Sequence, residues 1–127
     1  MGILTAAKPI ILICTRDVPR TAGFYRDILG LTPVSENTHA AVFATGGVML
    51  RVSLVPDFIV NGHTVMGFAV EDLAGTIQAL RGKGVVLHRP QNLILDEVGV
   101  WTVPGGLGQV AWIADPEGNL LSLTTVR

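Results

Sequence analysis

The chain has 127 residues and a formal net charge of −1, with 49% hydrophobic and 15% charged residues. This composition predicts a folded domain and excludes a disordered segment. Lys and Arg together number only 9 and form no basic block, which argues against nucleic-acid binding, since that binding depends on neutralising phosphates. No apolar run approaches the roughly 20 residues of a membrane span, and no signal peptide is expected.

The number of cysteines and the net charge indicate the cellular compartment and the class of ligand. Cys14 is the single cysteine, so an internal disulfide is excluded and a reducing compartment is favoured. We therefore expect a cytoplasmic protein. The near-neutral charge provides no strong field for attracting a cationic ligand. A small neutral or weakly acidic molecule is the partner we expect, with neither nucleic acid nor membrane.

The first half of the chain predicts a strand, a helix and three further strands. An apolar, β-branched run at 10–15 predicts the first strand, and Asp17 follows it in the position of a helix N-cap. Apolar residues then recur at helical spacing as far as Gly30, which can end the helix because glycine tolerates positive φ. The other strands are expected at 31–36, 40–45 and 48–55, and Gly47 is expected in the turn between the last two.

The second half repeats this order. A shift of 55 residues superposes Asp17 on Asp72, which follows an apolar strand at 64–70. A helical stripe after Asp72 is expected to end at Gly82 or Gly84. Three further strands are expected, with Gly118 in the turn before the last of them, at 85–89, 109–114 and 119–125.

The repeat predicts an α+β fold of two βαβββ modules, at about 8–56 and about 63–126, in a single domain 1–127. Between 90 and 108 the pattern is broken by prolines and glycines, which predicts an irregular loop. Long loops in compact domains often carry functional residues, and this one contains Trp101.

Two motifs resemble a known family. "DVPRTAGFYRDILGL", from Asp17, resembles its capped helix, and "AWIADPEGNLLSL", from Ala111, resembles its C-terminal turn and strand. Together they resemble the vicinal oxygen chelate superfamily, which includes glyoxalase I, extradiol dioxygenases, methylmalonyl-CoA epimerases and bleomycin-resistance proteins. The resemblance implies that the modules form a curved mixed sheet around a cleft, with the helices on the outer face. It says little about activity, because one fold hosts many functions.

The resemblance also implies where metal ligands would lie. In metal-using members they occur seven residues before each capping Asp and four residues after each turn Gly, and are His, Glu or Gln. Those positions here are Ile10, Val65, Arg51 and Ser122. Two of them have no donor atom, arginine brings an opposing charge, and serine is a weak ligand. We therefore expect no metal site and no cofactor.

The three histidines could form a different site. His63 shares a strand face with Val65 if that strand extends so far, whereas His39 and His88 lie near predicted strand ends. Their spacing does not resemble that of a ligand pair, and a metal would need at least three converging groups. We interpret them as exposed or loop-supporting residues.

Strand alternation predicts which side chains face the cleft. With two tryptophans added, they are Ile10, Leu12, Cys14, Met49, Arg51, Ser53, Val65, Gly67, Trp101, Trp112, Ser122 and Thr124. The surface they form is mostly apolar, with small residues that leave room for a ligand and a few polar groups that can orient it.

The polar and aromatic members of this set suggest roles. Arg51 either anchors an acidic or carbonyl group of a ligand or forms an internal salt bridge, for instance to Glu36, Asp96 or Glu97. Trp101 and Trp112 are candidates for stacking on an aromatic ligand, and the alternative for Trp112 is packing in the core.

Nucleophilic catalysis has little support. Cys14 lies in an apolar strand with no His or Asp placed as its partner, and such thiols are usually inert. Ser53 and Ser122 have no general base nearby in the sequence. The catalytic residues, if there are any, are not identified.

Three functions remain open. The leading hypothesis is a glyoxalase/bleomycin-resistance/dioxygenase-like protein without metal ligands that binds a small hydrophobic or acidic aromatic molecule. The alternative is an enzyme of the same superfamily, a lyase, epimerase or dioxygenase, with a relocated metal site or metal-free chemistry. The third is a structural or regulatory module that dimerises without using its cleft. We expect a homodimer in each case, because the open sheet edges invite pairing.

Overall fold

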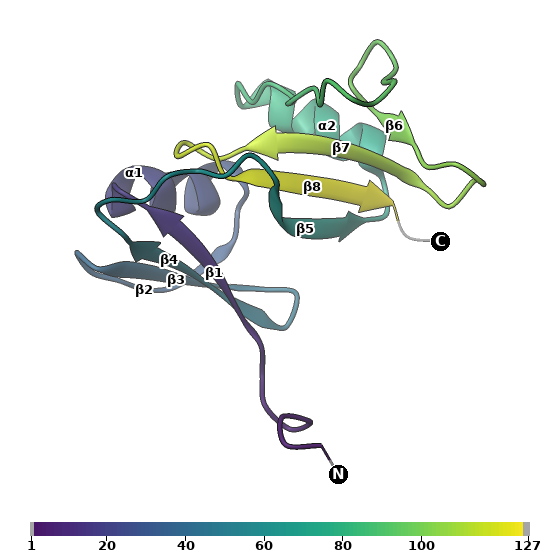
Figure 1. Ribbon diagram of the computed structural model, residues 1–127. Helices are drawn as coiled ribbons and strands as arrows, with labels where there is room; N and C mark the ends of the chain where they lie inside the picture. Colours follow the sequence, from purple (N-terminus) through teal and green to yellow (C-terminus); the bar gives the residue numbers. More distant parts are fainter. Residues whose placement is uncertain (1, 126–127) are drawn as a thin grey trace. The chain divides into compact units, whose positions relative to one another are not determined.

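The computed structural model describes residues 2–125, which fall into two compact units that divide between Ile59 and Val60. We call them the N-terminal unit and the C-terminal unit (Figure 1). Each is a βαβββ module with a four-stranded mixed sheet, as the internal repeat predicted. No helix among residues 2–125 is both long enough and apolar enough to cross a membrane.

The N-terminal unit has one sheet in the order β1-β4-β3-β2. Its elements are β1 (Ile10–Thr15), α1 (Val18–Gly23), the π-helical turn η1 (Phe24–Ile28), β2 (Thr32–Glu36), β3 (Ala40–Thr45) and β4 (Val48–Leu54). β1 is parallel to β4, and the other neighbouring strands are antiparallel. Figure 1 shows α1 over one face of this sheet; we call the other face its open face.

The helix begins and ends where the sequence predicted, but it changes form on the way. The side chain of Asp17 accepts a hydrogen bond from the backbone N–H of Arg20 at 3.2 Å, which caps the first turn. After Gly23 the α-helix becomes π-helical, and the N–H of Leu29 donates to the carbonyl of Phe24. Gly30 then takes a φ of +74°, which ends the helix as expected.

The core of the N-terminal unit lies between the helix and the sheet. Ile13, Leu50 and Val52 point from β1 and β4 toward α1 and η1 and are almost fully buried. Tyr25 is fully buried and packs edge-on against Phe24, with ring centroids 5.4 Å apart. Burying each large apolar side chain contributes roughly 1.5–3 kcal/mol, so this packing fixes which face of the sheet stays open.

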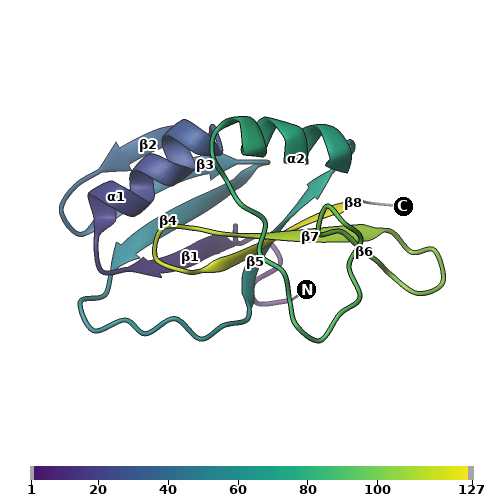
Figure 2. The ribbon, with the colours of Figure 1, turned by 90° about the horizontal axis from the view of Figure 1, so that it is seen from above.

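The C-terminal unit has a sheet in the order β5-β8-β7-β6, in which β5 is parallel to β8. Its elements are β5 (Thr64–Val70), α2 (Leu73–Gly82), β6 (Trp101–Thr102), β7 (Gln109–Ala114) and β8 (Leu120–Thr125). α2 lies along one side of the sheet (Figure 2), and again we call the opposite side the open face. The Asp72 side chain accepts from the N–H of Gly75 at 3.0 Å, confirming the second N-cap.

The prediction of a strand at 85–89 was wrong. Within this stretch only His88 pairs with the sheet, in a single bridge to Trp112. Pro90 follows almost at once, and a proline cannot donate to a strand ladder. The edge of the sheet is instead formed by β6, within the segment that the sequence marked as a loop.

The turn between β7 and β8 explains the motif "DPEGN". Asp115 Oδ1 accepts from the backbone N–H groups of Glu117 and Asn119, each at 2.9 Å, and Oδ2 accepts from the Asn119 side chain at 2.9 Å. Gly118 has a φ of +99°, a conformation that side chains disfavour. Asp115 and Asn119 are both buried, so this turn is held by satisfied polar groups.

Candidate functional site

The open face of the N-terminal sheet carries the side chains predicted for it. Ile10 and Leu12 of β1 are 59% and 63% exposed, whereas Ile13 and Leu50, which point the other way, are buried. Cys14 is half-buried on the same face. The neighbouring strand β4 adds a half-buried methionine and serine and an exposed arginine, namely Met49, Ser53 and Arg51. Exposed apolar side chains of this size suit contact with a ligand or another surface.

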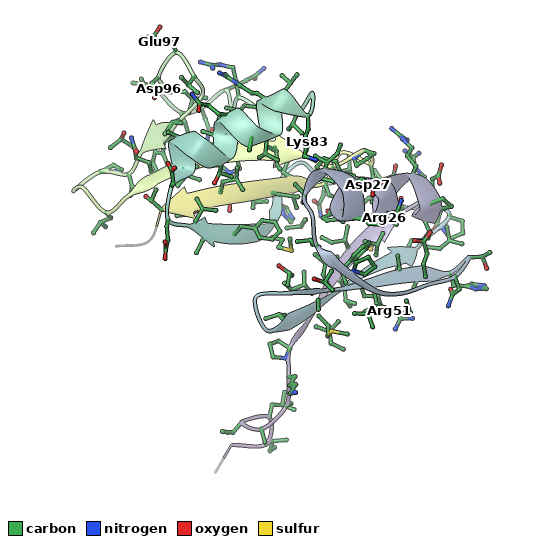
Figure 3. The ribbon with its side chains drawn as sticks, turned by 180° about the vertical axis from the view of Figure 1, so that it is seen from behind. Arg26, Asp27, Arg51, Lys83, Asp96 and Glu97 are labelled. Atoms are coloured by element: carbon green, nitrogen blue, oxygen red, sulfur yellow. The ribbon has the colours of Figure 1, made fainter. Side chains whose placement is uncertain are left out.

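Arg51 is exposed and points away from the helix-covered face (Figure 3). It pairs in register with Leu12 of β1 and Val42 of β3. A salt bridge to Glu36, one form of the alternative considered for Arg51, is not formed; Glu36 instead pairs with Arg26, with Nη1 and Oε1 3.3 Å apart. Within the described part of the N-terminal unit, residues 2–59, Arg51 makes no ion pair, so its guanidinium can bind an acidic group.

The open face of the C-terminal sheet combines small and aromatic residues. Gly67 of β5 is the partner of Ser122 on β8, and a Cβ atom at position 67 would lie 2.5 Å from Ser122 Oγ. A side chain at position 67 would therefore require the Ser122 hydroxyl to rotate away. The predicted neighbours on this face are exposed or half-buried: Val65, Ala69, Trp101, Trp112 and Thr124.

A β-bulge at Val65 brings one further residue to this face. Thr64 pairs with Leu120, but Met66 pairs with Leu121, so Val65 is the extra residue. Thr64 is consequently next to the open-face side chains. The sequence analysis had no signal for a bulge here.

Trp112 is half-buried on the open face and is not a core residue. Its indole Nε1 donates to Thr64 Oγ1 at 3.2 Å, so the side chain of a β7 residue reaches across β8 to β5. Trp101 packs against it, with ring centroids 6.3 Å apart and planes inclined by 34°. The indole is thus held in place and still partly open to a ligand.

A cavity of about 320 Å³ adjoins Trp112 within the C-terminal unit. His63 and His88 both line it, although the sequence separates them widely and gave neither a role in binding. Asn92 contributes a side-chain amide from the loop after His88. The remaining lining residues are Gly62, Thr64, Pro90, Leu93, Trp112 and Leu120.

A second cavity, of about 250 Å³, lies beside α2 and includes Ile77, Arg81 and Asp96 in its lining. Asp96 Oδ1 accepts backbone hydrogen bonds from Val98, Gly99 and Val100, each at 2.9 Å. These bonds, that from Val100 foremost, hold the pKa of Asp96 below its ordinary value. Arg81 is also engaged, because its Nη2 donates to the carbonyl of Val98 at 3.3 Å. Arg81 thus links the loop to the helix, whereas Asp96 holds the turn within the loop.

The positions that the resemblance assigns to metal ligands do not fit a metal ion. Ile10 and Val65 offer no donor atom, Arg51 is cationic, and Ser122 is a poor ligand for transition metals. Within residues 2–125, no three His, Cys, Asp or Glu side chains gather where they could hold a metal ion. The remaining histidine, His39, is exposed in the N-terminal unit.

Comparisons with known proteins agree with the geometry of the modules. The model of the Glyoxalase/Bleomycin resistance protein/Dioxygenase superfamily matches residues 9–123. No curated protein matches the chain significantly.

Solved structures show the same fold at low identity. A glyoxalase/bleomycin resistance protein/dioxygenase from Alicyclobacillus acidocaldarius matches with a TM-score of 0.73 and 17% identity, over 94% of this chain and 90% of that one. The lactoylglutathione lyase of Agrobacterium tumefaciens matches with a TM-score of 0.72 and 18% identity, over 94% of this chain and 93% of that one. A fosfomycin resistance protein of Listeria monocytogenes matches with a TM-score of 0.71 and 14% identity, over 94% of this chain and 92% of that one.

Proposed function

Because this chain belongs to the Glyoxalase/Bleomycin resistance protein/Dioxygenase superfamily, we propose that it is a binding protein for small hydrophobic or acidic aromatic molecules and works without a metal ion. The observation that carries the proposal is the position of Trp112 on the open face of the C-terminal sheet. Its indole is fixed by Thr64 and Trp101 and stands beside small residues and a cavity.

The small residues give an aromatic ligand room beside the indole. Gly67 has no side chain, and Ser122, its partner in register, is directly opposite Trp112 on β7. A flat ring could therefore lie on the sheet with its edge or face against the indole. Aromatic pairs of this kind contribute about 0.5–1.5 kcal/mol beyond the burial of their area.

The acidic group of such a ligand would need a cation or hydrogen-bond donors. Arg51 was the candidate from the sequence, and it is exposed without an ion pair in the described part of the N-terminal unit. It belongs to the N-terminal unit, whereas both tryptophans belong to the C-terminal unit. We therefore base the proposal on the C-terminal open face and keep Arg51→Ala as a variant to be tested.

Tryptophan fluorescence can test the proposal, since Trp101 and Trp112 are the only tryptophans of the chain. Wild-type protein would be titrated with neutral and acidic single-ring and two-ring aromatic compounds. We expect saturable quenching by at least one of them, and a loss of affinity of about tenfold or more in Trp112→Ala. Absence of saturable binding by every compound, up to their solubility limits, would refute the proposal.

The alternative is an enzyme of the same superfamily with a relocated metal site or metal-free chemistry. Elemental analysis after exposure to Zn²⁺, Ni²⁺, Mn²⁺ and Fe²⁺ distinguishes the metal-dependent case. We expect less than about a tenth of an equivalent per chain and no thermal stabilisation by the ions. One bound equivalent per chain would favour the enzyme.

We also propose that the chain forms a homodimer. Each sheet ends in strands with a neighbour on one side only, β1 and β2 in the N-terminal unit and β5 and β6 in the C-terminal unit. On β2, Val34 is 53% exposed. Unpaired edges with exposed apolar residues favour association with a second copy. Sedimentation analysis tests this: a monomer at all concentrations would contradict it.

A further inference from the structure

The cavity beside Trp112 has a lining that selects for one kind of ligand. Its polar side chains are two histidines, an asparagine and a threonine, and none of its nine lining residues is Asp or Glu. Imidazole N–H, amide N–H and hydroxyl groups can all donate hydrogen bonds. With donors present and no carboxylate in the lining to repel it, an anionic group can be bound here.

The Thr64 hydroxyl can still donate a hydrogen bond, because it acts as the acceptor in its bond to Trp112. Its Oγ1 accepts from the indole Nε1 at 3.2 Å, and a hydroxyl that accepts one hydrogen bond keeps its own hydrogen for donation. No other bond of this hydroxyl is formed among residues 2–125. The residue that holds the indole in place is therefore also able to bind a ligand oxygen.

Each histidine makes a hydrogen bond to the backbone carbonyl of another lining residue. The N–H of His88 donates to the carbonyl of Trp112 at 2.8 Å, which fixes His88 beside the indole. His63 Nδ1 is 3.4 Å from the carbonyl of Thr64, a long bond that leaves Nε2 for another partner. A ring N–H that donates to an ionised carboxylate forms a charge-assisted bond, roughly twice as strong as a bond between neutral groups.

The rest of the lining is apolar and the volume is small. Leu93, Pro90 and Leu120 line the cavity, which is open to solvent, together with the indole. About 320 Å³ lies at the lower end of the range for small-molecule pockets, so the ligand is limited to about one ring.

We infer that this cavity binds a single-ring aromatic carboxylate, with the ring against Trp112 and the carboxylate among His63, His88, Asn92 and the Thr64 hydroxyl. The inference rests on the proposed function and makes it specific: the acidic group is held in the C-terminal unit, and Arg51 is not needed.

Benzoate and its neutral analogue benzamide are the probes, titrated into the full chain and followed by calorimetry and tryptophan fluorescence. The variants are His63→Gln, His88→Gln and their combination. His39→Gln is the matched control, because it makes the same change in the N-terminal unit, and Arg51→Ala tests the competing anchor. Far-UV circular dichroism and thermal melting confirm that each variant is folded.

We expect the wild type to prefer benzoate over benzamide by about tenfold, the contribution of one charge-assisted hydrogen bond. Each single histidine variant should lose part of that preference, and the double variant most of it. His39→Gln and Arg51→Ala should bind benzoate as the wild type does.

The inference is overturned if benzoate does not bind, if it binds no better than benzamide, or if Arg51→Ala abolishes its binding while the histidine variants do not. In the last two cases the proposed function survives, because an aromatic ligand is still bound. Only the failure of the whole aromatic series, neutral and acidic, refutes both.

Discussion

Trp112 and Thr64 are joined by a hydrogen bond of 3.2 Å between the indole Nε1 and Oγ1, although they belong to strands that are not neighbours. The bond crosses β8 on the open face of the C-terminal sheet. It depends on the bulge at Val65, which sets Thr64 in register with Leu120. The position of the Trp112 indole, which the proposed ligand would contact, therefore depends on the β-bulge in β5.

Trp112→Phe tests this bond without removing the ring. The variant loses the N–H donor, so the free energy of unfolding should fall by about 1 kcal/mol, the usual contribution of one hydrogen bond. Aromatic ligands should still bind, because the ring is retained. Urea denaturation measures the stability, and Trp101→Phe is the control, since it removes an indole that makes no such bond to Thr64. Equal stability of Trp112→Phe and wild type would show that the bond contributes nothing.

Gly67→Ala tests the close packing on the open face. The new methyl group would meet Ser122 Oγ at 2.5 Å, and the next nearest atoms are at 3.8 Å or more. Because the Ser122 side chain can change rotamer to relieve this contact, we expect a loss of stability of no more than about 1 kcal/mol. Ser122→Ala removes the one clashing atom, so the double variant should recover most of that loss. Strictly additive effects in this double-mutant cycle would contradict the packing account.

Much of the fold could be predicted because it depends on local chemistry. Asp17 and Asp72 cap their helices through side-chain bonds to N–H groups a few residues ahead, which a sequence pattern can indicate. Gly47 and Gly118 take positive φ in the turns where they were expected. The alternation of β1 and β4 also predicted which side chains are buried under the helix.

The features that were missed depend on contacts between distant segments. The strand expected at 85–89 has suitable residues, but Pro90 ends its pairing after the single bridge of His88. The bulge at Val65 depends on the pairing of β5 with β8. His63 and His88 line one cavity only because the segments before β5 and after α2 meet beside Trp112. No spacing in the sequence indicates such a meeting.

Asp96 gives a stability effect that depends on pH. The backbone N–H groups of Val100, Gly99 and Val98 favour its carboxylate, so its pKa is lower in the folded chain than in the unfolded one. Its contribution should be fully present above the unfolded value of about 4 and be lost as the pH falls through the lower, folded value. Asp96→Ala should therefore be less stable than wild type at pH 7, and the difference should shrink below about pH 4. Denaturation of both proteins at pH 7 and below about pH 4 measures the difference in their free energies of unfolding. A difference that does not change with pH would contradict the lowered pKa of Asp96.

Asp115 should matter more for stability than the capping Asp17, although both bind backbone N–H groups. Asp115 is buried and its loss would leave the N–H groups of Glu117 and Asn119 without their partner. Asp115→Ala should cost about 2–3 kcal/mol. Asp17 is exposed, and Asp17→Ala should cost about 1 kcal/mol, as for a typical N-cap. Equal losses in urea denaturation would show that burial of the turn is not what makes Asp115 important.

The most direct test of metal-free aromatic binding is one comparison of the wild-type chain with and without chelator. Protein treated with excess EDTA and untreated protein supplemented with Zn²⁺, Ni²⁺, Mn²⁺ or Fe²⁺ would each be titrated with benzoate, followed by tryptophan fluorescence. The account predicts the same saturable curve and the same Kd in every sample, within about twofold. Binding that disappears with EDTA and returns with one of the metal ions would contradict it, because the ligand would then be held through a metal that Ile10, Val65, Arg51 and Ser122 cannot bind.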